Sequence, residues 1–272
     1  MITGDGLLAH HQLSHGDGVP LVLLHGFPLD SRMWHDVVAL LPGEHSVIAL
    51  DLPGMGESPS GPDVARTLGT DATPSIDVSA DAVAATLRAL GVERAVVAGL
   101  SMGGYVVLAL LERHPGLLAG AALLDTKAGA DAPAAVENRL RIADEVEANL
   151  NVDAVLNMRR ALLGETNREL RPDLVERLDG WIRDQGPAGV AWCQRAMAAR
   201  PDRFAALGAF DGPVAVIVGD QDELSPVGQA QSMVDAARDA TLSVVPRAGH
   251  MTTIEAPEPV AAALAALVRR VG

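Results

Sequence analysis

Short aliphatic runs alternate along this chain with longer segments whose apolar residues recur at helical spacing. Runs of this kind indicate strands buried on both faces. The repeated order of strand and helix predicts an open, mostly parallel sheet with helices on both faces. In the first half of the chain the predicted strands are Leu21–Leu24, Ser46–Leu50, Arg94–Ala98 and Ala119–Asp125, and the predicted helices are Asp30–Leu41, Asp77–Leu90 and Met102–Arg113.

The alternation stops near Thr126. Residues 131–207 contain no strand-like run and are rich in Ala, Leu, Arg and Glu, which indicates a helical insertion. Its predicted helices span about 134–150, 152–163, 172–184 and 188–199, and strands at Val214–Val218 and Thr241–Val245, each followed by a helix, restore the pattern. We therefore expect a core made of residues 1–126 and 208–272 and a helical domain made of residues 127–207. Residues 57–76 are predicted to form a long polar loop.

The balance of charge narrows the possible partners. The chain has 272 residues and a net charge of −14, which disfavours binding to nucleic acid or to anionic membrane surfaces. No apolar run approaches the roughly 20 residues of a membrane helix, and residues 1–18 show no secretory pattern, so we expect a cytoplasmic protein. The single cysteine, Cys193, excludes an intrachain disulfide, and the scattered histidines give no support for a metal site.

A candidate nucleophile lies between a predicted strand and a predicted helix, in the pattern Gly99-x-Ser101-x-Gly103. A serine at such a sharp turn is forced into a strained backbone conformation, and its neighbours two residues away must be small. The turn lifts the hydroxyl above the carboxyl edge of the sheet, where open α/β sheets bind ligands. The helix that follows favours negative charge at its N-terminus.

An active serine needs a base, and the base needs an acid that orients it. Two histidines follow Ser101: His114 closes a helix, as a structural cap would, whereas His250 follows a predicted strand. Three aspartates at the ends of predicted strands are candidates for the acid, and spacing alone does not choose among Asp125, Asp220 and Asp222. We therefore expect His250 to be the base.

Two backbone amides are expected to form an oxyanion hole, which binds the negative oxygen of a tetrahedral intermediate. One belongs to Met102, the residue after the nucleophile, and the other belongs to the loop after Leu21–Leu24. In that loop Pro28 has no N–H to donate, so Phe27 is the expected donor.

Five segments together resemble the α/β-hydrolase superfamily over about residues 21–268. They are similar to its oxyanion loop, its DxPGxGxS loop, its nucleophile elbow, its acid loop and its histidine loop: His25-Gly-Phe-Pro28, Asp51-Leu-Pro-Gly-Met-Gly-Glu-Ser58, Gly99-Leu-Ser-Met-Gly-Gly-Tyr105, Gly219-Asp-Gln-Asp222 with Pro226, and Ala248-Gly-His250 with Glu255 and Pro257. The chain departs from the family at Met55, where histidine is usual, and in the loop 57–76, which looks longer than usual.

The resemblance implies an α/β-hydrolase fold with a helical cap insertion, and it implies that Asp222 is the acid. The chain looks most like small cytoplasmic esterases and lactonases, including 3-oxoadipate enol-lactonase, and like cofactor-free haloperoxidases. The expected chemistry is acyl transfer from a small-molecule ester, thioester or lactone to water through Ser101, His250 and Asp222, with no cofactor and no metal.

Several alternatives stay open at this point. The same three side chains serve hydrolysis of carbon–carbon bonds and perhydrolysis, and a receptor of low turnover can retain them. The substrate and the oligomeric state are not specified by the sequence. Candidate residues for the substrate pocket are Trp34, Met158, Trp181 and Trp192, although packing between helices is the favoured interpretation for Met158, Trp181 and Trp192.

Overall fold

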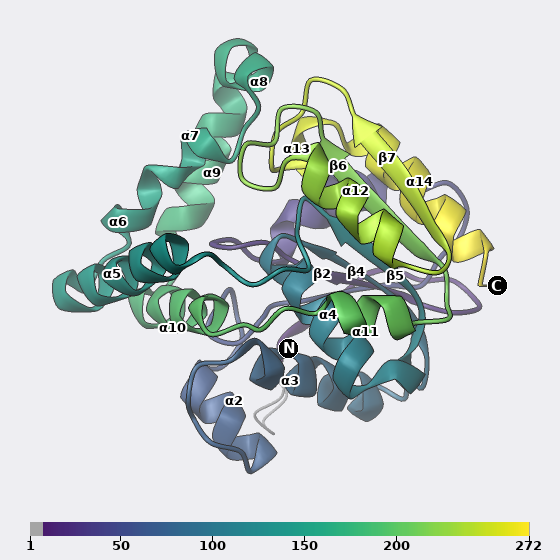
Figure 1. The fold of residues 1–272 in the computed structure, drawn as a ribbon, viewed down its shortest axis with the longest axis horizontal. Helices are drawn as coiled ribbons and strands as arrows, with labels where there is room; N and C mark the ends of the chain where they lie inside the picture. Colours follow the sequence, from purple (N-terminus) through teal and green to yellow (C-terminus); the bar gives the residue numbers. More distant parts are fainter. Residues whose placement is uncertain (1–7, 272) are drawn as a thin grey trace.

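The computed structural model describes residues 8–271, and within them the chain forms a seven-stranded sheet in the order β1-β3-β2-β4-β5-β6-β7. β1 runs antiparallel to β3. The other neighbouring strands pair in parallel, among them β6 and β7 in Figure 1. The predicted open, mostly parallel sheet is therefore confirmed. The strands are β1 (His10–Ser14), β2 (Leu21–Leu24), β3 (Val47–Leu50), β4 (Ala95–Leu100), β5 (Leu118–Leu124), β6 (Val214–Gly219) and β7 (Ala240–Val245).

The central strands contain almost only apolar residues because helices cover both faces of the sheet. Every residue of β2 through β6 is buried. β1 was not predicted, since its sequence, HHQLS, is mostly polar. It forms because it pairs with β3 at the edge of the sheet, with an irregular register between Gln12 and Ser14.

Helices cover both faces of the sheet. α4 packs against β4 and β5 and contacts α3 and α11, and α14 packs on β5, β6 and α1. The bounds are η1 (Ser31–Trp34), α1 (His35–Ala39), α2 (Gly61–Leu68), α3 (Ile76–Ala89), α4 (Met102–Arg113), η2 (Pro115–Leu117), α11 (Phe204–Ala209), α12 (Val227–Ala236), α13 (Thr252–Glu255) and α14 (Pro257–Arg269).

Two of these elements correct the predictions. The helix predicted over 30–41 is a 3₁₀ turn followed by the short α1, and the turn begins where the Asp30 side chain accepts a hydrogen bond from the amide of Arg32. The stretch 57–76 is not all loop, because α2 lies within it. The Ser60 side chain caps the start of α2, and Gly69 ends the helix in a left-handed conformation with φ of 67°.

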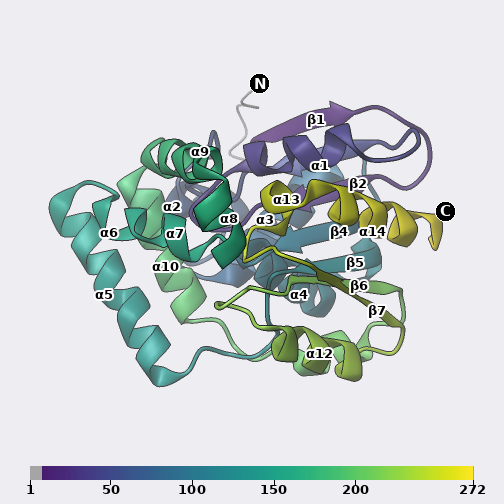
Figure 2. The same ribbon diagram turned by 90° about the horizontal axis from the view of Figure 1, so that it is seen from above.

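Residues 127–207, called the helical insertion here, hold α5–α10, which lie together beyond one end of the strands (Figures 1 and 2). The predicted helix 152–163 is divided into α6 and α7, and α8 was not predicted. Their bounds are α5 (Pro133–Asn149), α6 (Asp153–Leu156), α7 (Met158–Ala161), α8 (Glu165–Leu170), α9 (Pro172–Arg183) and α10 (Pro187–Ala198). Among residues 8–271 no helix is both long and apolar enough to cross a bilayer.

Candidate active site

Ser101 occupies the sharp turn between β4 and α4, with φ of 52° and ψ of −109°. Holding a residue in so sparsely populated a conformation costs roughly 1–3 kcal/mol. The turn closes because two neighbours lack side chains: a Cβ on Gly99 would lie 2.2 Å from the carbonyl of Gly103, and a Cβ on Gly103 would lie 2.3 Å from the carbonyl oxygen of Leu24. The amide of Ser101 donates to the carbonyl of Leu124 at 2.8 Å. The next strand therefore holds the turn in place.

His250, in the loop after β7, connects Ser101 to Asp222, in the loop after β6. Its Nε2 lies 2.8 Å from the Oγ of Ser101, and its Nδ1 lies 2.8 Å from Oδ2 of Asp222. Because an ionised carboxylate only accepts hydrogen bonds, Nδ1 carries the proton and Nε2 is left to accept from the serine hydroxyl. The three side chains form a continuous hydrogen-bonded series from a half-buried hydroxyl to a buried carboxylate.

The carboxylate of Asp222 is fixed on both of its oxygens. While Oδ2 faces His250, Oδ1 accepts from the amides of Leu224 at 2.8 Å and Ser225 at 2.9 Å. Burial acts to raise the pKa of Asp222, but a positive charge on His250, its hydrogen bond and the two amides together hold that pKa below its usual value. Asp222 is therefore ionised at neutral pH and oriented toward the imidazole.

The other two candidate acids face different groups. Asp220 is exposed, and its Oδ1 accepts from the amide of Arg247 at 2.7 Å. Asp125 is fully buried below the site, where it accepts from the amide of Gly219 at 3.0 Å and from the hydroxyl of Thr252 at 2.5 Å. Burial and the neighbouring charge of Asp222 raise the pKa of Asp125. Of the three aspartates, the structure brings Asp222 to His250.

The amide of Phe27 lies in the loop after β2, and the amide of Met102 lies directly after the serine. Met102 is the first residue of α4, so its N–H has no acceptor within the helix. Neither of the two amides has a hydrogen-bond acceptor among residues 8–271. The positive end of the α4 dipole adds to the attraction for a negative oxygen at this point.

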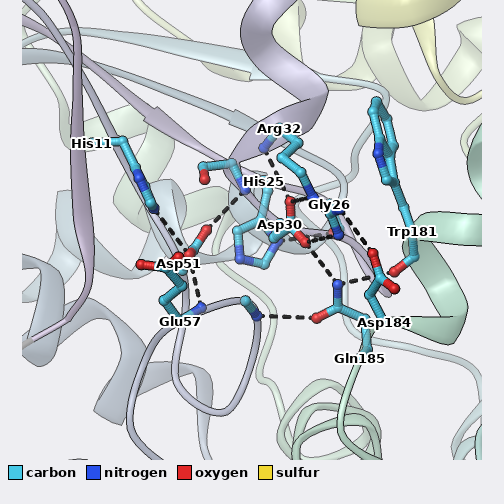
Figure 3. Close-up of polar contacts among 12 residues, drawn as sticks. His11, His25, Gly26, Asp30, Arg32, Asp51, Glu57, Trp181, Asp184 and Gln185 are labelled. Carbon is cyan, nitrogen blue, oxygen red and sulfur yellow. Dashed lines mark hydrogen bonds and ion pairs between the residues drawn. The ribbon is translucent and has the colours of Figure 1, made fainter. Parts of the chain in front are cut away.

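A buried polar network holds the loop that carries Phe27 (Figure 3). His25 accepts from the amide of Leu52 through Nε2 at 2.8 Å, so its Nδ1 carries the proton and donates to the carbonyl of Gly26 at 3.0 Å. Asp51 accepts from the amide of Ser31 at 2.9 Å. The polar loops after β2 and β3 are thereby fixed to each other, and the backbone around Phe27 is fixed with them.

Ser101 and His250 open into a pocket of about 400 Å³ between the strand ends and the helical insertion. One part of its wall is apolar, and another carries charged and amide side chains. The apolar lining includes Phe27, Ile142, Met158, Leu162 and Met197, and the polar lining includes Lys127, Asp131, Asn138, Arg139, Gln194 and Glu223. A larger hollow of about 680 Å³ lies elsewhere, around Arg94 and Phe210, and neither Ser101 nor His250 lines it.

Comparison with known proteins identifies the family. A family model described as the alpha/beta hydrolase fold matches residues 19–257. The chain belongs to the α/β hydrolase fold family. The 2-succinyl-6-hydroxy-2,4-cyclohexadiene-1-carboxylate synthase of Enterobacter sp. (strain 638) is 30% identical over 261 residues, which cover 92% of this chain and 91% of that protein.

Solved structures agree with that assignment. A thermophilic esterase from Thermogutta terrifontis, solved with malate bound, is similar with a TM-score of 0.88 and 36% identity, covering 97% of this chain and 93% of its own. The enol-lactonase from Burkholderia xenovorans LB400 shares the fold, with a TM-score of 0.81, 23% identity and coverage of 96% of each chain. The family and fold expected from the sequence are confirmed.

Glu255 is a site residue to which the sequence assigned no role. In this α/β hydrolase its buried carboxylate accepts from the amides of Gly249 and Gly164, each at 2.8 Å, and from the side chain of Asn167 at 2.8 Å. It thereby ties the loop before His250 to the helical insertion. Burial raises the pKa of Glu255, and these donors offset part of that rise. Its position five residues after His250 was the available signal.

Of the four side chains predicted to line the substrate pocket, Met158 does so and the three tryptophans do not. Trp34 is fully buried in the core, and Trp192 packs α10 onto α2, where a Cβ on Gly61 would lie 2.3 Å from its indole ring. Trp181 is half-buried between the guanidinium groups of Arg32 and Arg177, each 5.8 Å from a ring centroid. The tryptophans join elements to one another, and none of the three lines the pocket that holds Ser101 and His250.

The described part of the chain brings together no group of three or more His, Cys, Asp or Glu side chains that could hold a metal ion. Cys193, the single cysteine, is buried on α10 with its thiol 3.7 Å from the carbonyl of Pro53.

Proposed function

We propose that this α/β hydrolase is a serine hydrolase that cleaves a small-molecule ester, thioester or lactone. The observation that carries the proposal is the pair of 2.8 Å contacts from His250, one to the hydroxyl of Ser101 and one to the carboxylate of Asp222. A neutral imidazole in this arrangement accepts a proton through Nε2 while Asp222 holds its tautomer. The amides of Phe27 and Met102, which have no acceptor within residues 8–271, supply the second requirement of acyl transfer.

In the proposed reaction, Nε2 of His250 takes the hydroxyl proton as Oγ of Ser101 attacks the carbonyl carbon. The resulting oxyanion accepts hydrogen bonds from the amides of Phe27 and Met102, and a donor of this kind typically contributes about 3–4 kcal/mol. His250 then gives the proton to the departing alkoxide or thiolate. Water hydrolyses the acyl-enzyme with His250 again as base, while Asp222 remains ionised throughout.

We further propose that the helical insertion acts as a cap over this site. Side chains from α5, α7 and α10 line the same pocket as Ser101 and His250. The backbone amide of His250 donates to the carbonyl of Leu162 at 3.0 Å, so the insertion also contacts the histidine loop directly. A pocket walled in this way limits the size of the acyl group.

The test is hydrolysis of p-nitrophenyl esters from acetate to octanoate by the wild type and by Ser101→Ala. We expect turnover by the wild type with an optimum at short or medium chain length, and a fall in kcat of at least about 10⁴-fold in Ser101→Ala. A Ser101→Ala variant that retains the wild-type rate would remove Ser101 from the reaction. A folded wild type that hydrolyses none of these esters would contradict an esterase for neutral acyl esters and restrict the proposal to lactones, thioesters and anionic esters.

A further inference from the structure

One carboxylate in the pocket wall is surrounded by three cations. The side chain of Asp131 is 1% exposed, and it contacts Lys127 Nζ at 3.0 Å, Arg139 Nε at 2.7 Å and Arg200 Nη1 at 2.7 Å. The cations come from the loop after β5, from α5 and from the residues after α10. One negative charge therefore meets three positive ones, which leaves a surplus of two.

Arg200 is the structural partner of Asp131. Its side chain is 2% exposed, and its two terminal nitrogens reach both carboxylate oxygens, at 2.7 and 2.9 Å. It also donates to the carbonyls of Met197 and Gly129 and lies 3.9 Å from the centroid of the Tyr105 ring. A buried bidentate pair of this kind neutralises the carboxylate. The surplus positive charge therefore belongs to Lys127 and Arg139.

Lys127 and Arg139 both line the pocket into which Ser101 and His250 open. Arg139 donates through Nε to Asp131 and through Nη1 to Gln194 at 3.2 Å, and its Nη2 has no acceptor among residues 8–271. The ammonium of Lys127 has three N–H donors, and Asp131 is the only carboxylate among those residues that it pairs with. Lys127 and Arg139 thus bring N–H donors without an acceptor among residues 8–271 to the pocket that also holds the Ser101 hydroxyl.

The remaining acidic side chain in the pocket wall does not cancel this charge. Glu223 is 75% exposed at the mouth and lies 3.7 Å from Arg168 on α8. Its charge is screened by water and shared with another cation. Lys127 and Arg139, by contrast, are 23% and 20% exposed, so their charges act in a setting with little water.

We propose that Lys127 and Arg139 bind a carboxylate carried by the substrate, so that the enzyme prefers esters with a free carboxylate over neutral esters of equal length. Two donor groups match the two oxygens of a carboxylate. This inference rests on the proposed ester hydrolysis. It places the negative group of the substrate at the α5 side of the pocket and the scissile carbonyl at Ser101.

The test compares pairs of esters that have the same carbon chain length and differ in a terminal carboxylate. Monomethyl adipate is paired with methyl hexanoate to place the carboxylate on the acyl side, and 4-acetoxybutyrate is paired with butyl acetate to place it on the alcohol side. We expect kcat/KM to favour the anionic member of one pair by about 10- to 100-fold, the equivalent of one or two charge-assisted hydrogen bonds. That ratio should fall at least tenfold in Lys127→Met and in Arg139→Gln, mainly through KM. Thermal melting of each variant verifies that it is folded.

Arg141→Gln is the matched control, because Arg141 lies on the same helix but is 62% exposed and pairs with Glu145. It should leave the ratio unchanged. Hydrolysis of neutral and anionic esters at equal efficiency by the wild type would overturn the inference and leave the ester hydrolase standing. A ratio that stays the same in Lys127→Met and Arg139→Gln would also overturn it.

A binding measurement tests the carboxylate site without requiring turnover of an ester. Lys127 is the single lysine of the chain. The folded protein is reductively methylated, and mass spectrometry of the peptide that contains Lys127 then reports on that side chain alone. Adipate should slow the methylation of Lys127 in the catalytically inactive Ser101→Ala variant, whereas hexanoate at the same concentration should protect less. Equal protection by both compounds, or none by either, would overturn the carboxylate site even if no ester is hydrolysed.

Discussion

Two glycines without side chains hold the reacting hydroxyl where it is. Gly99 and Gly103 lie back to back at the turn around Ser101, and each faces backbone atoms at distances that no Cβ tolerates. Backbone cannot move aside as the end of a flexible side chain does. The position of the serine therefore depends on residues that take no part in the chemistry.

Gly99→Ala tests this dependence. A Cβ placed 2.2 Å from the Gly103 carbonyl must push the turn open, and we expect a loss of about 1–3 kcal/mol or more in the free energy of unfolding. Ester hydrolysis should fall with it. The control is Gly180→Ala in α9, where a Cβ meets nothing within 4 Å and helix propensity predicts a gain of up to about 1 kcal/mol. Urea unfolding of both variants is the measurement, and equal stabilities would contradict the steric argument.

Asp222 and Asp220 lie two residues apart and differ in what they face. Replacing Asp222 by Asn removes the acceptor that fixes the tautomer of His250, and we expect kcat to fall by about 10⁴-fold. Asp220→Asn changes only a contact to the amide of Arg247, so kcat should stay within about tenfold of wild type because the triad is intact. Steady-state rates with p-nitrophenyl acetate decide between them. A larger loss in Asp220→Asn would assign the acid to Asp220.

Asp220 and Asp222 show which feature of the site the sequence could not predict. The strand pattern placed Asp125, Asp220 and Asp222 at the same edge of the sheet, since all three follow parallel strands. It did not say which carboxylate turns toward His250, because that depends on the hydrogen bonds of each loop. Likewise the tryptophans were recognisable as large apolar groups, but their neighbours come from segments distant in sequence.

At the scale of elements, the helical insertion is fastened to the core by a glutamine. Gln185, 4% exposed just after α9, accepts from the amide of Gly56 at 3.0 Å and donates to Asp30 at 2.7 Å (Figure 3). Two loops of the core are thereby joined to one end of the insertion. Near this contact α10 packs closely on the core, where a Cβ on Gly189 would lie 1.8 Å from the carbonyl oxygen of Gly54.

The thiol of Cys193 reports on this junction. Burial raises the pKa of Cys193 to about 12, so the native protein should react very slowly with a disulfide reagent at pH 8. Gln185→Ala leaves the Gly56 amide without its acceptor and removes one donor from the buried Asp30 carboxylate, which keeps Arg32, at a cost of about 1–3 kcal/mol. If the insertion opens locally, Cys193 should then react roughly 5- to 100-fold faster. Exposed Gln231→Ala is the control, and unchanged reactivity in Gln185→Ala would mean that this contact does not hold the insertion.

Elements with a strong apolar period were predictable, and those that depend on distant partners were not. Five of the six strands of the parallel part were found because they are nearly continuous aliphatic runs, and β7 was found although Thr and Ser interrupt its aliphatic residues. β1 and α8 were missed because both are polar and are stabilised by pairing or packing with segments far along the chain. In 57–76, clustered Pro, Gly and Ser predicted a loop, yet Ser60 and Gly69 are the two caps of α2.

At the scale of the whole molecule, a chain of net charge −14 gathers cations around one buried carboxylate. Burial acts to raise the pKa of Asp131, but its hydrogen bonds to Arg200 and Arg139 and the charges of both hold that pKa far below its usual value. A carboxyl whose folded pKa is depressed contributes stability above its unfolded pKa, and that contribution is lost as pH falls toward the folded value. Asp131 should therefore contribute to acid sensitivity below about pH 4.

Asp131→Asn tests this contribution. Three cations lose their counter-charge, and we expect the free energy of unfolding at pH 7 to fall by about 3–5 kcal/mol. Between pH 5 and pH 3, however, the variant should lose less further stability than the wild type does. Urea unfolding across that range is the measurement, with Asp211→Asn, 83% exposed, as control. If the free energy of unfolding of Asp131→Asn fell with pH as steeply as that of the wild type, Asp131 would not contribute to the acid sensitivity.

The proposed chemistry depends most on Ser101 being the group that attacks the substrate. The most direct measurement is labelling with diethyl p-nitrophenyl phosphate, in which a nucleophilic serine displaces p-nitrophenolate and keeps the phosphoryl group. We expect one diethylphosphoryl adduct per chain, located on Ser101 by peptide mass spectrometry, with esterase activity lost in proportion. Asp222→Asn should label far more slowly. An adduct on another residue that abolishes activity, or full labelling of an active enzyme, would contradict the role given to Ser101.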